Sequence, residues 1–224
     1  KSNLTQPMNK FIIFTFAIFF TSLAWCQKKV SELTLVYDAM ITTGSNEPKM
    51  ADAFDGATTT VYLKGNLSRS ELSSALFSST TIHDSKTGAA VVLREVSGQK
   101  LLIRMSPENW IEKNKKYQGI KFTNTNEKKT IAGYTCTKAV ATLSDGSTFA
   151  VYYTTEIIPE NKEYDYQFKN LNGLPLEYEL TQGKLKIKYT VSKISLNPVP
   201  ASKFDIPKGG YREMTYEESK KTGL

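Results

Sequence analysis

From residue 32 onward, apolar and polar residues alternate along most of this chain with a period of two. Successive side chains of a β-strand point to opposite faces, so each such run predicts a strand with one buried and one solvated side. The clearest run sets Leu185, Ile187, Tyr189 and Val191 against Lys184, Lys186, Lys188, Thr190 and Ser192. One-sided strands of this kind are typical of antiparallel sheets rather than parallel ones.

Glycine-containing pairs separate the alternating runs at five places: Gly65-Asn66, Thr87-Gly88, Ser97-Gly98, Asp145-Gly146 and Gln182-Gly183. Such pairs between alternating segments are a strong signal for β-hairpins. We therefore predict a mainly β protein in which residues 32–208 form a single antiparallel meander sheet.

Two short segments carry the start signals of a helix. Ser106 and Pro107 are favoured at the N-cap and at the first helical position, so we expect a helix of two or three turns from there to Lys113. The spacing of Thr215 and Glu218 is that of a capping box, and it predicts a short terminal helix or a frayed tail within residues 209–224. Residues 43–55 are rich in turn-forming residues, and we expect a long loop there.

The N-terminal 26 residues are typical of upstream sequence followed by a secretory signal peptide. Met8-Asn9-Lys10 forms a cationic head, and the 15 residues from Phe11 to Trp25 carry no charge. A membrane-spanning helix needs about 20 apolar residues, so a cleaved signal fits better than an anchor. Cleavage between Cys26 and Gln27 is the favoured interpretation. The alternative is a lipoprotein in which Cys26 is acylated, although Trp25 stands where such signals have a small residue.

Composition limits the partners. The formal net charge is +7 at pH 7, but basic and acidic residues are interspersed, so we expect no nucleic-acid partner. We also expect no transmembrane helix in the mature chain, and an exported protein that is periplasmic or associated with the outer membrane. Cleavage after Cys26 leaves only Cys136, which excludes an internal disulfide and predicts a small apolar core residue.

The residue types that support catalysis are sparse. His83 is the single histidine, and the neighbouring Asp84 on the same strand points to the opposite face, which argues against a catalytic triad. Glu177 and Glu179 share a face, as an acid/base pair does, but solvated strand charge explains them equally well. We therefore predict a non-enzyme with no catalytic residue, no metal site and no cofactor.

Aromatic residues are numerous on the predicted strands. Tyrosine in a sheet mostly packs with a solvated hydroxyl, while in a strongly curved sheet it can instead line an apolar trough. The candidates for lining such a trough are Trp110, Tyr152, Tyr166 and Tyr178.

Residues 128–139, read as Lys-Lys-Thr-Ile-Ala-Gly-Tyr-Thr-Cys-Thr-Lys-Ala, resemble the characteristic block of GLPGLI-type envelope proteins. The motif residues in this block are Gly133, Tyr134, Cys136 and Lys138. A Val-Tyr-Tyr-Thr strand (151–154) follows, and then Gly173-Leu174-Pro175-Leu176-Glu177-Tyr178, as in a neighbouring family of unknown function. The second Gly-Leu-Ile is replaced here, which favours that sister family.

The resemblance implies export in Bacteroidota-like bacteria and an antiparallel half-open barrel, similar to the lipoprotein carrier and receptor of the Lol pathway. It implies no established activity or catalytic residue. The motif also has a purely architectural explanation, because glycine permits backbone geometry closed to other residues and Pro175 suits a strand start or edge. We expect Gly133 to sit at a bend or bulge where a side chain would clash.

Two functions follow from these observations. The first is an exported, non-enzymatic binder of an apolar ligand, such as a lipid or acyl chain, with the Trp110 helix as a lid. The second is an envelope module whose partner is another protein, bound through the 43–55 loop or the tail after Pro207.

Overall fold

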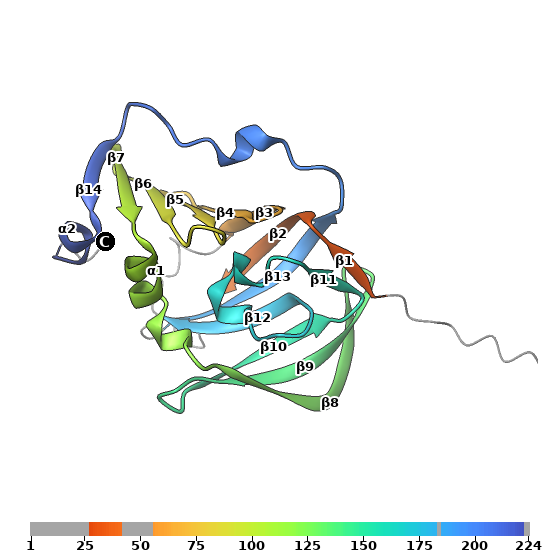
Figure 1. Cartoon of the computed structure of the whole chain (residues 1–224). Helices are drawn as coiled ribbons and strands as arrows, with labels where there is room; N and C mark the ends of the chain where they lie inside the picture. Colours follow the sequence, from red (N-terminus) through yellow and green to blue (C-terminus); the bar gives the residue numbers. More distant parts are fainter. Residues whose placement is uncertain (1–26, 42–55, 183–184, 222–224) are drawn as a thin grey trace, which may run out of the picture.

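The computed structural model describes residues 27–41, 56–182 and 185–221 (Figure 1). The predicted signal peptide with Cys26, the 43–55 loop and Gly183 of the last predicted turn lie outside the described residues. Among the helices that are described, none has the length and apolar character required to cross a membrane.

A strongly curved sheet of twelve strands dominates the fold, and it does not close into a barrel. Its strands, in spatial order, are β14 (Arg212–Thr215), β7 (Gln99–Met105), β6 (Ala90–Val96), β5 (Phe77–Asp84), β4 (Leu67–Ser73), β3 (Thr58–Lys64), β2 (Glu32–Ile41), β13 (Leu185–Ser195), β12 (Leu174–Gln182), β10 (Thr148–Thr154), β9 (Tyr134–Thr142) and β8 (Lys121–Ile131). A separate parallel pair joins β1 (Lys28–Val30) to β11 (Ile157–Pro159). The predicted mainly β, mostly antiparallel, curved sheet is confirmed.

The strand order corrects one detail of the prediction, because the sheet contains two meanders rather than one. Strands β2 to β7 pair in sequence, and a second series, made of β8, β9, β10, β12 and β13, returns to pair with β2. After β7 the chain therefore crosses to the opposite edge of the sheet. Helix α1 (Pro107–Lys113) and the 3-10 turn η1 (Lys115–Tyr117) make this crossing, which a two-residue hairpin could not span.

Helix α1 forms where the sequence predicts it. The Ser106 side chain accepts a hydrogen bond from the backbone of Asn109, whose side chain bonds back to the Ser106 backbone, and Pro107 occupies the first turn. Together with η2 (Lys162–Tyr164) and η3 (Tyr166–Phe168), α1 lies across the concave side of the sheet (Figure 1). The concave side is therefore largely filled.

Two apolar clusters make up most of the interior. The larger joins the second meander to β2 and β3 and includes Phe168 and Leu171 from the segment after η2. The smaller lies between β6, β7 and α1 and includes Val92, Ile103 and Trp110.

The C-terminal segment covers the convex side and then completes one edge of the sheet. Val199 and Phe204, the last residue of η4 (Ala201–Phe204), pack on Ile82, which faces away from the concave side. Strand β14 then pairs in parallel with β7, and α2 (Tyr216–Lys221) ends the described chain. Within residues 209–224, where we predicted a short terminal helix or a frayed tail, the helix is present as α2, whereas strand β14 was not predicted. Met214 is buried beside the Trp110 cluster, and this burial holds the segment in the sheet.

Candidate functional site

The concave faces of β4 and β5 are polar, unlike those of the neighbouring strands. Ser68 pairs with His83 and Ser70 with Thr81 across the two strands, so the four side chains form one polar patch. They form the floor of a cavity of about 150 Å³, which we call the inner cavity. Its lining residues are Val61, Ser68, Ser70, Thr81, His83, Trp110, Asn114, Tyr164, Asp165 and Tyr166.

Helix α1 and the segment from η2 to η3 bring the other lining residues, apart from Val61 of β3, over this floor. The indole of Trp110 stacks on the imidazole of His83, with ring centroids 4.6 Å apart and planes 20° from parallel. Asn114 donates through its side-chain amide to the carbonyl oxygen of Trp110 at 2.9 Å, which closes the C-terminal turn of α1. Tyr164, Asp165 and Tyr166 follow one another at the junction of η2 and η3.

Three side chains of the inner cavity hold buried polar atoms without a hydrogen-bond partner among the described residues. These atoms are Nδ1 and Nε2 of His83, Nε1 of Trp110 and Oη of Tyr164. His83 is only 2% exposed and Trp110 is 9% exposed. An unpaired buried polar group costs about 1–3 kcal/mol, so these atoms require water or a ligand in the cavity.

Burial also sets the ionisation of the site. It lowers the pKa of His83, against the opposing effect of Glu163 and Asp84, so the imidazole is neutral at pH 7. It raises the pKa of Asp165 to about 6, although the carboxylate accepts hydrogen bonds from the backbone and side-chain nitrogens of Gln167, each at 3.2 Å. At pH 7 the cavity therefore combines a neutral imidazole with a carboxylate that is largely ionised.

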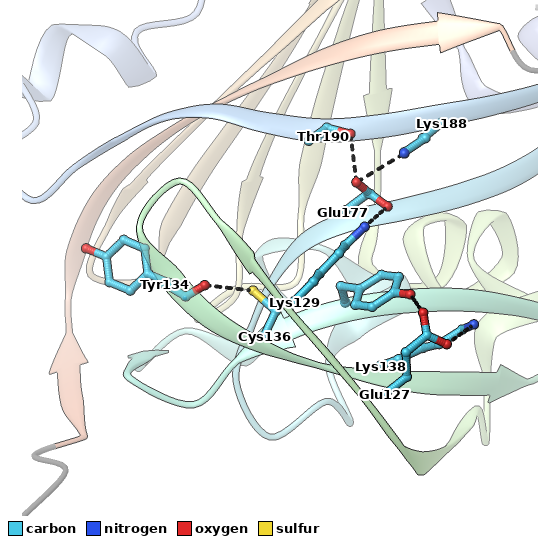
Figure 2. Close-up of polar contacts among 9 residues, drawn as sticks. Glu127, Lys129, Tyr134, Cys136, Lys138, Glu177, Lys188 and Thr190 are labelled. Atoms are coloured by element: carbon cyan, nitrogen blue, oxygen red, sulfur yellow. Dashed lines mark hydrogen bonds and ion pairs between the residues drawn. The ribbon is translucent and has the colours of Figure 1, made fainter.

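A charged network surrounds Glu177, one of the two predicted carboxylates (Figure 2). It lies on the face of β12 opposite Tyr178, and therefore on the convex side of the sheet. Glu177 accepts from Lys129 at 2.5 Å and lies 3.3 Å from Lys188, and its side chain is 11% exposed. Glu179 is 4.0 Å from Lys186. Each carboxylate thus has a lysine partner, as structural ion pairs do.

Tyr152 belongs to this convex network and not to the concave side. Its hydroxyl donates to Glu127, which also accepts from Lys138 at 2.7 Å, and the Lys129 ammonium lies 3.8 Å from the centre of its ring. Tyr178 packs in the larger apolar cluster, edge-on to Tyr37 and to Phe168. Of the four candidate lining residues, Trp110 and Tyr166 meet at the inner cavity, whereas Tyr152 and Tyr178 do not line it.

The first half of the family-like motif forms the β8–β9 hairpin. Ala132 and Gly133 both have positive φ, 49° and 84°, as a two-residue hairpin turn of type I′ requires. A side chain at Gly133 would meet no atom within 4 Å, so the predicted clash was wrong and the backbone conformation is what requires glycine. Tyr134 is half-buried, and Cys136 is fully buried, as predicted. Burial raises the pKa of the Cys136 thiol to about 11.

The second half of the motif is a close backbone crossing. A Cβ at Gly173 would lie 2.2 Å from the carbonyl oxygen of Thr154, so only glycine fits there. Leu174 next to it is fully buried, and the Pro175 carbonyl accepts a hydrogen bond from the Tyr37 hydroxyl at 2.8 Å. All these contacts are architectural, and none of these residues lines the inner cavity.

Asp165 and Tyr164 escaped the sequence analysis, and His83 was considered only as a catalytic residue. The available signal was the loss of apolar alternation in Leu67–Ser73 and Ser78–Thr81, which places serine and threonine on both faces of adjacent strands. Nothing comparable marks Asp165, which lies in an irregular segment.

Comparison with family models and with curated proteins finds no match. Among solved structures, PNGF-II superposes with a TM-score of 0.51 at 11% identity, over 86% of this chain. The chain spans only 33% of PNGF-II, so the likeness concerns the fold of one part of that protein. Two further structures are more distant. MucB has a TM-score of 0.37 at 12% identity, over 80% of this chain and 58% of MucB. A β-barrel-like protein of the domain of unknown function DUF1849 from Brucella abortus has a TM-score of 0.39 at 9% identity, over 76% of this chain and 99% of that protein.

Proposed function

We propose that this protein is an exported, non-enzymatic binding protein that holds a small molecule in the inner cavity beneath α1. The observation that carries the proposal is the set of unpartnered polar atoms of His83, Trp110 and Tyr164 around one cavity. A concave, aromatic-lined hollow with a few convergent polar groups is the usual form of a small-molecule site. The inner cavity is smaller than the roughly 300–1,000 Å³ of sites for drug-sized ligands, which indicates a small ligand.

The non-enzymatic part of the proposal rests on the surroundings of the titratable groups. His83 has no hydrogen-bond partner among the described residues, so neither a carboxylate nor a hydroxyl is coupled to it as a triad would need. Within the described part of the chain, Asp165 accepts hydrogen bonds only from Gln167 in the same short segment. The described residues around the inner cavity therefore form no hydrogen-bonded nucleophile–base pair.

Export is proposed from the N-terminal sequence pattern and from the resemblance to GLPGLI-type envelope proteins. Mass spectrometry of the mature protein tests it. A mature N-terminus at Gln27 supports secretion, an acylated Cys26 supports a lipoprotein, and an intact N-terminus in the cytoplasmic fraction contradicts export.

Filling the cavity tests the binding function. Ser68 is 4% exposed on the cavity floor, and Ser68→Leu places an apolar side chain there, while Ser73→Leu adds the same side chain at an exposed position of β4. A fragment screen by ligand-observed NMR should give hits that compete with one another, that persist in Ser73→Leu and that are lost in folded Ser68→Leu. Hits that bind both variants equally would place binding elsewhere and contradict the proposal.

An apolar ligand is the second candidate, and it requires α1 to move. The inner cavity is too small and too polar for an acyl chain with α1 in place, but Trp110 covers apolar side chains of β6 and β7, among them Val92 and Ile103. Displacing α1 would uncover this strip, as the lid function predicts. Saturable binding of a fluorescent acyl probe to delipidated protein, strengthened by Trp110→Ala, supports this candidate, and the absence of saturable binding excludes it.

A further inference from the structure

Asp165 gives the inner cavity its charge. It is the one lining residue that carries a formal charge at neutral pH, since His83 is neutral and the other lining residues do not ionise near pH 7. Among the described residues, none of the salt bridges includes Asp165. The Asp165 side chain is half-buried. A carboxylate that is partly removed from water without a cation beside it is unfavourable, so an occupant with a positive charge would be favoured over a neutral one.

The aromatic lining favours the same kind of occupant. Trp110, Tyr164 and Tyr166 all border the cavity, and the faces of such rings attract ammonium groups. The Tyr166 ring already holds one, because the Nζ atom of Lys169 lies 3.9 Å from its centre. This contact shows that the Tyr166 ring packs against an ammonium group.

The unpartnered atoms define the rest of the ligand. Nε1 of Trp110 is a donor only, and a neutral imidazole offers one donor and one acceptor nitrogen. A ligand that satisfies them needs an oxygen that accepts a hydrogen bond, and a hydroxyl group serves because it both accepts and donates. The volume of about 150 Å³ restricts the molecule to a few heavy atoms.

We propose that the inner cavity binds a small organic cation of the amino-alcohol class, with its ammonium group beside Asp165 and the aromatic rings and its hydroxyl toward His83 and Trp110. This inference rests on the proposed binding function and adds the chemical class of the ligand. A ligand of this size gains at most about 1.5 kcal/mol per heavy atom, so micromolar to millimolar dissociation constants are the range to search.

Pairs of charged and neutral molecules of equal shape provide the test. We would titrate the protein with choline and with its uncharged analogue 3,3-dimethyl-1-butanol, and with ethanolamine and ethylene glycol. The readouts are calorimetry and the indole N–H signal of Trp110, assigned with Trp110→Phe. We expect saturable binding of at least one cation and binding at least about tenfold weaker for its neutral analogue, which corresponds to about 1.4 kcal/mol.

A variant of the carboxylate locates the effect. Asp165→Asn should weaken cation binding by about tenfold or more and leave the neutral analogue unchanged. Asp205→Asn, at an exposed position after η4, is the matched control and should change neither. The comparison of isosteres uses the wild-type protein, so it stands even if a variant fails to fold.

Each other result overturns the inference. Equal affinities within both pairs would show that charge is not recognised, while leaving small-molecule binding in place. Cation binding that survives Asp165→Asn would place the cation elsewhere. If neither cation saturates the protein at concentrations up to about 10 mM, the ligand class is excluded. The fragment screen described above would then decide the proposed function separately.

Discussion

Replacing Asp165 by asparagine should stabilise the folded protein at neutral pH. The carboxylate has an ordinary pKa of 3.8, and burial raises this pKa to about 6 in the folded state. The difference, at about 1.4 kcal/mol for each pKa unit, corresponds to about 3 kcal/mol of unfavourable free energy once both folded and unfolded states are ionised. Asparagine has nearly the same shape and retains an oxygen that accepts from the Gln167 backbone. Allowing about 1 kcal/mol for the weakened second bond to Gln167, we expect a net stabilisation of about 2 kcal/mol.

The pH dependence gives this prediction its sign. Because the folded-state pKa is raised, the stability contributed by protonated Asp165 is fully present below pH 3.8 and is lost as the pH rises through about 6. The groups near this carboxylate are Tyr164, Tyr37 and Tyr178, and burial raises their pKa values well above the usual one, so they remain neutral through this window. The stability gained by Asp165→Asn over the wild type should therefore be largest at neutral pH and small near pH 4.

Urea unfolding measures the effect. Wild type, Asp165→Asn and the exposed control Asp205→Asn would be compared at about pH 4 and about pH 7.5, on either side of the titration. The reasoning is refuted if Asp165→Asn destabilises the protein at both pH values alike, because the ionised carboxylate would then be stabilised by contacts that asparagine cannot replace.

Four further outcomes follow from the contacts around the motif. Gly173→Ala should destabilise the protein by about 2 kcal/mol or more, because the added Cβ meets the Thr154 carbonyl. Gly133→Ala should destabilise it by only about 1–2 kcal/mol, because alanine disfavours the positive φ at this position. Chemical denaturation of both variants checks this order, and equal losses of stability would contradict it. Cys136 should react slowly with a thiol reagent in the native state and rapidly in denaturant, because burial raises the pKa of the thiol to about 11; fast native labelling would show an exposed sulfur. Glu177→Gln should destabilise by about 1–3 kcal/mol in low salt and by less in high salt, as it leaves Lys129 and Lys188 without their shared partner; a loss that is independent of salt would assign the effect to packing instead.

The sequence predicts the sheet because its signals are local. Alternation from Leu185 to Val191 and the turn at Asp145-Gly146 depend only on neighbouring residues, and the strand and the turn both occur as predicted. The path of the chain depends on long-range pairing instead, and no residue near α1 indicates that β8 will lie at the far edge of the sheet. Strand β14 was not predicted either, because four residues have too little pattern to predict a strand.

The candidate site shows the same division. Trp110 was recognised because its helix has clear start signals and its side chain is large. Tyr152 was predicted to line the same trough as Trp110, and this was wrong. Tyr152 and Val151 are neighbours in β10 and point to opposite faces of the sheet, and Val151 is the buried one of the two. Asp165 acquires its role only from packing against residues far away in sequence, which no local pattern encodes.

The parallel pairing of β14 with β7 makes the last strand of the sheet dependent on residues about 110 positions earlier in the chain. This strand has only four residues, so we expect it to detach more readily than the rest of the sheet. Its departure would remove Met214 from the cluster around Trp110 and expose the backbone edge of β7. A row of unpaired backbone groups of this kind can pair with a strand from another molecule. Exchange of C-terminal strands between two copies would therefore begin at the edge of β7 that β14 covers.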